Sequence, residues 1–250
     1  MIGMALRQLR ANLITTAALT GAVVAVLGVH GAAARGVRTR LARVCASANP
    51  TACQARQDDL RGMFMEITPY LGYLTITTVL IAVFWGAPLV SREVETGTAA
   101  LAWCQSITRR RWLASRLITA VSVVGALGLV LGFSVTWWLA SFTATPQYGE
   151  SVLTIVALHG PLLAAMWIAG LLIGVLVGTV IRRMISAMAV TAVITFAAAI
   201  AFNLTSIFYL SDPVGEIEVL ADQLLRSIPL LVLGAIAALA AFKLVRKVSV

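Results

Sequence analysis

Long runs of apolar residues alternate with short polar segments along the whole chain of 250 residues. A membrane-spanning helix needs about 20 predominantly apolar residues, and six runs meet this requirement. They cover residues 12–30, 67–90, 117–140, 154–181, 184–210 and 227–245. The first run is too long for a signal-peptide core, so we read it as an uncleaved span. The pattern predicts an all-α integral membrane protein with six transmembrane helices in a single domain, residues 1–250.

Composition and charge place this protein in a membrane. The chain is 60% hydrophobic and 12% charged, whereas soluble domains are about 25% charged. Its net charge of +9 therefore reflects the excess of basic residues on the cytoplasmic side of membrane proteins, and no nucleic-acid partner is expected. With the N-terminus inside, twelve of the 19 basic residues face the cytoplasm. We expect a multi-pass protein of the cell membrane with both termini cytoplasmic.

The segment 31–65 departs from this charge rule. It is expected as an outer loop, yet it contains six arginines. Its stretch CASANPTAC holds Cys45 and Cys53, and nearby cysteines outside the cell form disulfides readily. The alternative is two thiols in an irregular loop. Cys104 lies on the reducing inner side, and His30 and His159 are too far apart in sequence to predict a metal site.

No motif for catalysis or ATP binding occurs in the sequence. It contains no HExxH, GxSxG or GxxxxGK[ST] pattern, and its only lysines are Lys243 and Lys247. The six spans carry no acid that would relay protons, which argues against a secondary transporter. The chain is therefore not expected to be an enzyme or to bind a cofactor, and uphill transport would need energy from a partner.

The polar connection between the second and third spans carries a recognisable pattern. The stretch REVETGTAALAWCQSITRRRWLASRL resembles the signature of type-2 ABC exporter permeases, particularly the actinobacterial kind. The matching positions are Arg92, Glu93, Glu95, Gly97, Thr98, Leu101, Ala102, Trp103, Gln105, Ser106, Thr108, Arg109, Arg111 and Trp112. The N-terminal ALRQLRAN is similar to the short amphipathic helix that precedes the first span in these permeases.

The resemblance implies a permease subunit that moves a substrate out of the cell by alternating access. ATP and Mg would be bound by a separate ATPase subunit, expected in two copies, and the permease would form a homodimer or a heterodimer. Residues 91–116 would be the cytoplasmic coupling segment, with a coupling helix. Its expected interface residues are Glu93, Glu95, Gly97, Thr98, Arg109 and Arg111. The alternatives are a non-transporting docking or immunity protein and a secondary transporter.

Local signals divide the coupling segment into two helices. Gly97 is expected to take a positive φ between them, and Thr98 to cap a helix over 99–106. Thr108 is expected to cap the helix that leads into the third span. The arginines after it either meet a partner or anchor the span to lipid phosphates, while the acids suit coupling or a structural ion pair.

Two further groups of residues have alternative interpretations. Gly170, Gly174 and Gly178 recur every four residues, which permits close helix packing either within the bundle or across a dimer seam. Phe133, Trp137 and Asn203 are candidate residues of a substrate route. The alternatives are an aromatic belt for the two rings and an interhelical hydrogen bond for the asparagine.

Overall fold

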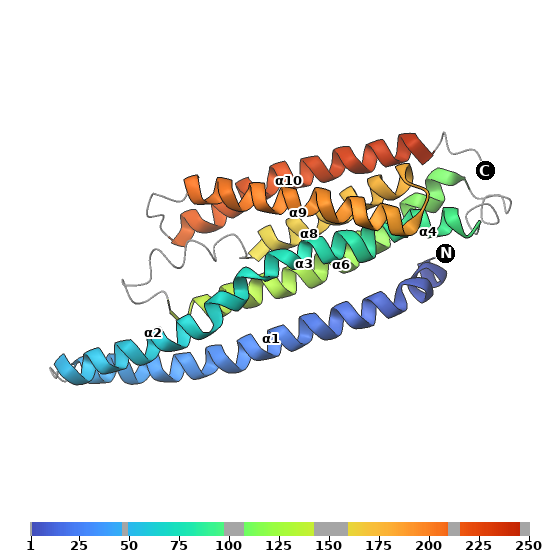
Figure 1. Cartoon of the computed structure of the whole chain (residues 1–250). Helices are drawn as coiled ribbons and strands as arrows, with labels where there is room; N and C mark the ends of the chain where they lie inside the picture. Colours follow the sequence, from blue (N-terminus) through green and yellow to red (C-terminus); the bar gives the residue numbers. More distant parts are fainter. Residues whose placement is uncertain (1, 47–49, 98–107, 143–159, 210–215, 246–250) are drawn as a thin grey trace.

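The computed structural model describes residues 2–46, 50–97, 108–142, 160–209 and 216–245. The described part consists of helices joined by short turns (Figure 1). These helices are α1 (Ile2–Ala46), α2 (Pro50–Gly72), α3 (Leu74–Ile81), η1 (Ala82–Gly86), α4 (Pro88–Glu95), α6 (Arg109–Leu139), α8 (Gly160–Val180), α9 (Met184–Tyr209) and α10 (Glu216–Val245).

Among the described residues, six helical segments are long and apolar enough to cross a membrane. They are Ala11–Ala46, Pro50–Glu95, Arg109–Leu139, Gly160–Val180, Met184–Phe202 and Leu224–Val245. The predicted all-α fold with six spans is confirmed. Residues 154–159 of the fourth predicted span lie outside the described residues, and α1 is continuous from Ile2, so no break separates its first turns from the first span.

Segment 31–65 differs from the expected outer loop, because it is helical apart from residues 47–49, which lie outside the description. Residues 31–46 extend α1, and residues 50–65 belong to α2. At 45 residues, α1 is about 68 Å long, roughly twice the thickness of the hydrocarbon core of a membrane. The two helices form a hairpin that projects from one end of the bundle (Figure 1).

An apolar seam explains why this charged hairpin is helical. Leu41 of α1 and Leu60 and Phe64 of α2 are buried in the same hydrophobic cluster. A disulfide joins Cys45 to Cys53, whose Cα atoms are 4.8 Å apart. Helices of this kind draw their stability from packing of one apolar face, so the arginines on the other faces remain compatible with helix.

The second span is built from four consecutive pieces, α2, α3, η1 and α4. η1 is a π-helix, in which the amide of Ala87 donates to the carbonyl of Ala82 five residues earlier, at 2.9 Å. Pro88 follows directly at the start of α4. Because proline has no N–H and its ring clashes with the carbonyl four residues earlier, Pro88 displaces the carbonyl of Phe84 from regular helix bonding. The proline thus accounts for the widened turn.

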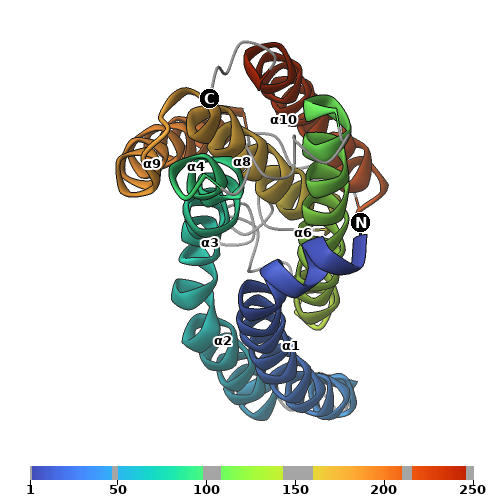
Figure 2. The same ribbon diagram turned by 90° about the vertical axis from the view of Figure 1, so that its right-hand side faces the viewer.

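α8 lies in the middle of the bundle, between α3, η1 and α4 on one side and α6 and α10 on the other (Figure 2). Its sequence is apolar on all sides, which is typical of a helix buried in protein. A Cβ added to Gly174 would lie 2.3 Å from the carbonyl oxygen of Ala82, and one added to Gly178 would lie 2.3 Å from that of Ala87. A Cβ added to Gly170 would lie 3.1 Å from the carbonyl oxygen of Thr78. The glycine stripe therefore packs within the chain.

We expect Gly174→Ala to destabilise the protein, because its methyl group would collide with the π-helix backbone. Overpacking of this kind costs about 1–3 kcal/mol, which corresponds to a decrease in Tm of about 5 °C for a chain of this size. Thermal unfolding in detergent measures the effect. Gly21→Ala is the matched control, since nothing lies within 4 Å of its added Cβ. Equal melting temperatures for the two variants would contradict the packing argument.

Candidate functional site

The candidate site lies at the end of the bundle where α4 finishes. Thr96 closes α4, with its amide bonded to the carbonyl of Arg92 at 3.0 Å. Gly97 follows with φ of +72°, in the left-handed region that ends many helices. The predicted positive φ of Gly97 is confirmed. Thr98 and the expected helix over 99–106 lie outside the described residues.

Thr108 caps the start of α6, as predicted. Its backbone is extended, and its hydroxyl oxygen accepts from the amide of Arg111 at 3.4 Å. The first turn of α6 contains three arginines, from Arg109 to Arg111, and no acid. The helix dipole disfavours cations at this end. Helix stability therefore does not explain these arginines, whereas an anionic neighbour outside the helix would.

Glu93 joins α4 to α6 through an ion pair. Its Oε1 atom lies 3.1 Å from Nη2 of Arg116, and the two side chains are only 13% and 11% exposed. The guanidinium of Arg116 also lies 5.2 Å from the centroid of the Trp112 ring. Removing one partner of a largely buried pair would leave the other charge uncompensated. The pair therefore fixes the start of the third span against the end of the second.

Glu95 makes the corresponding connection to α9. Its Oε2 atom accepts from the amide of Met184, the first residue of α9, at 2.8 Å. A carboxylate at this position satisfies a free amide and interacts favourably with the helix dipole. Two acids on one short helix thus bind the beginnings of two other spans.

The remaining predicted residues do not gather at this site. Phe133 and Trp137 lie on α6, where 54% and 40% of their surfaces are exposed. The guanidinium of Arg35 lies 3.8 Å from the centroid of the Trp137 ring. Asn203 belongs to α9, but its side chain lies outside the described part. Phe133 and Trp137 thus share one face of α6, four residues apart, and no described contact joins them to the site at the end of α4.

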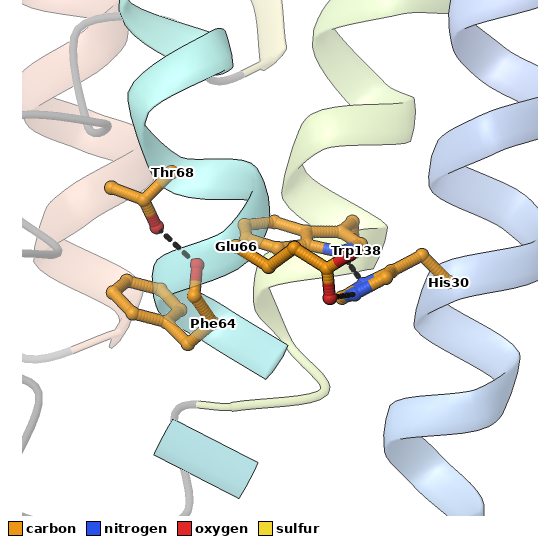
Figure 3. Close-up of polar contacts among 5 residues, drawn as sticks. All are labelled: His30, Phe64, Glu66, Thr68 and Trp138. Carbon is orange, nitrogen blue, oxygen red and sulfur yellow. Dashed lines mark hydrogen bonds and ion pairs between the residues drawn. The ribbon is translucent and has the colours of Figure 1, made fainter. Parts of the chain in front are cut away.

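A polar and aromatic cluster fixes the base of the hairpin at the opposite end (Figure 3). Nε1 of Trp138 donates to Nδ1 of His30 at 3.0 Å, and Nε2 of His30 lies 3.9 Å from Glu66. Phe64 stacks on Trp138 with ring centroids 5.8 Å apart. Its carbonyl accepts the hydroxyl of Thr68. The cluster joins α1, α2 and α6.

Sequence reasoning missed the role of Asn12. Its Nδ2 atom donates to the carbonyl oxygen of Phe84 at 3.0 Å, which is the carbonyl that Pro88 leaves without a helical donor. Next to it, Nε1 of Trp85 donates to the hydroxyl of Thr16 at 3.0 Å. The spacing of Phe84 and Pro88 marks the displaced carbonyl in the sequence, but nothing local identifies its partner on α1.

Residues 15–206 match the family described as ABC-2 membrane transporter related. The chain belongs to this family. The match covers the second to fifth spans and the whole candidate site, so the protein is a multi-pass transporter permease subunit. No curated protein and no solved structure matches the chain. In the described part of the structure, no group of His, Cys, Asp or Glu side chains is arranged to hold a metal ion.

A double-mutant cycle tests the ion pair. We expect Glu93→Gln and Arg116→Gln each to lower the free energy of unfolding by about 3 kcal/mol, because each removes one partner of a largely buried ion pair. The double variant should lose less than the sum of the two, as measured by unfolding in detergent. Asp58→Asn is the control, since it removes a carboxylate that is exposed on the hairpin. Additive losses would show that the two residues act independently.

Proposed function

We propose that this permease subunit belongs to an ATP-driven exporter and works with a separate ATPase subunit, present in two copies. The sequence provides no phosphate-binding loop of its own. Family membership supports a complex in which two permease subunits pair and two ATPases contact segment 91–116. ATP and Mg would then be bound entirely by the partner.

The two acidic links of α4 are the main support for this proposal. Glu93 holds the start of α6, and Glu95 holds the start of α9. A force applied to the segment between α4 and α6 is therefore transmitted to the second, third and fifth spans together. Such a rigid connection lets a small movement of an attached ATPase alter the packing of several spans at once.

The arginines at the start of α6 supply a docking surface in this proposal. They stand where the helix dipole disfavours positive charge, so acidic side chains of an ATPase would stabilise them. Charge complementarity of this kind guides association and fixes orientation.

The orientation we propose places the α4 end in the cytoplasm. The start of α1 and the end of α10 lie at this same end (Figure 1), so both termini would be cytoplasmic. The hairpin with the Cys45–Cys53 disulfide lies at the other end. Disulfides persist in oxidising compartments, which agrees with a hairpin outside the cell.

Labelling of single cysteines tests the orientation. In a Cys104→Ser background, Thr96→Cys should react with a membrane-impermeant maleimide only after the cells are permeabilised. Asp58→Cys on the hairpin should react in intact cells. Both positions are exposed in the structure, so accessibility does not limit the reaction. The reverse pattern would place the α4 end outside and exclude an ATPase partner there.

The variant Arg111→Glu separates ATPase docking from helix stability. It completes a Thr-x-x-Glu capping box with Thr108, so α6 should keep or gain stability. In co-purification with a candidate ATPase subunit, retention of that subunit should nevertheless fall about tenfold, because one docking charge is reversed. ATP hydrolysis by the complex in vesicles should fall with it.

Arg40→Glu is the matched control for this experiment, since Arg40 is exposed on the hairpin at the other end of the molecule. Unchanged retention for Arg40→Glu and reduced retention for Arg111→Glu are the expected pair of results. Full retention and full ATP hydrolysis with Arg111→Glu would refute docking at this surface.

A further inference from the structure

Two neighbouring cavities lie between the first half of α1 and the segment formed by α3, η1 and α4. The first, of about 330 Å³, is lined by residues that include Thr15, Thr16, Thr20 and Thr77. We call it the threonine cavity. The second, of about 340 Å³, is lined by Arg92, Glu93 and Arg116 among others. We call it the arginine cavity. Each volume falls in the range of small-molecule sites, about 300–1,000 Å³.

The two cavities share a wall. Asn12, Phe84 and Trp85 line both of them. This wall is the π-helix, together with the hydrogen bonds that Asn12 and Thr16 form with it. π-helical turns occur frequently at functional sites. The cavities are therefore adjacent compartments of one cleft, which begins among the spans and ends beside the ion pair of α4.

The threonine cavity suits an apolar chain. Among the side chains that the structure describes, no charged one lines it. The hydroxyl of Thr15 donates to a carbonyl of its own helix, and the hydroxyls of Thr16 and Thr77 accept from Trp85 and Trp167. Because these polar atoms already have protein partners, the lining presents mainly methyl groups and aromatic rings to a ligand.

The arginine cavity suits an anion. Glu93 is neutralised by Arg116 at 3.1 Å. The structure gives Arg92 no ion-pair partner among the described residues, and its side chain is exposed at the cavity wall. The described side chains of the lining thus carry one positive charge in excess. A guanidinium binds phosphate or carboxylate through two parallel hydrogen bonds, which makes Arg92 suited to an anionic head group.

From this pairing of an uncharged compartment with a cationic one, we propose that the cleft binds one anionic amphiphile of the surrounding membrane. The phosphate or carboxylate head contacts Arg92, and the apolar chain passes Phe84 and Trp85 into the threonine cavity. Phe84 lines both cavities and is 52% exposed, so the ligand would enter from the lipid beside this ring. The proposal requires only the cleft and holds whether or not an ATPase drives the permease.

Native mass spectrometry of the purified full chain tests the proposal, with lysophosphatidylglycerol and lysophosphatidylcholine as probes. We expect one molecule of the anionic probe to remain bound per chain, at least about tenfold more tightly than the zwitterionic probe. Arg92→Gln should abolish this preference. Thr20→Phe should weaken both probes, because Thr20 is buried at the wall of the threonine cavity (5% exposed) and a larger ring fills the space.

Two matched controls separate the cleft from general effects of charge and bulk. Arg182→Gln removes an exposed charge that does not line either cavity, and Ala18→Phe adds the same ring to an exposed position of α1 outside the cavity. Both should bind the anionic probe like the unaltered protein. Equal binding of the two probes, or equal losses in the variants and their controls, would overturn the proposal.

Discussion

The contact between α8 and the broken second span determines how the rest of the molecule is arranged. Inside a membrane, helices gain little from excluding water, so close van der Waals packing has to hold them together. Gly174 and Gly178 allow the backbone of α8 to approach Ala82 and Ala87 directly. On its other side, α8 receives Gly132 of α6, whose added Cβ would lie 2.1 Å from the carbonyl oxygen of Gly160. α8 is thus held on both sides by close backbone contacts, which only glycines permit.

This packing also explains why the π-helix η1 influences both the ligand cleft and the acidic links of α4. η1 is pressed against Gly174 on one side, so the carbonyl displaced by Pro88 turns toward α1, where Asn12 satisfies it. α4 leaves the same turn and carries Glu93 and Glu95 to α6 and α9. A movement of α4 would therefore change the wall that the two cavities share. The ligand cleft and the acidic links depend on the same few residues of backbone.

The sequence predicted those features whose cause is local. Apolar runs predict spans, a glycine after α4 predicts a left-handed turn, and Thr108 before a helix predicts a cap. The helical hairpin was not predicted, because its stability comes from a seam between two helices and a disulfide, not from a long apolar run. The hydrogen-bond partner of Glu95 could not be predicted either, since Met184 lies 89 residues further along the chain. Only the folded chain brings such groups together.

The arginines of the hairpin illustrate the same distinction for charge. Arg35 and Arg38 donate to the carbonyls of Trp137 and Ala140, at the carboxyl end of α6. Cations at this end satisfy carbonyls that have no helical donor and interact favourably with the helix dipole. Their positions are thus explained by helix capping, and they carry little information about which side of the membrane they face. The excess of basic charge in 31–65 is therefore weaker evidence against an outer location than a count of arginines indicates.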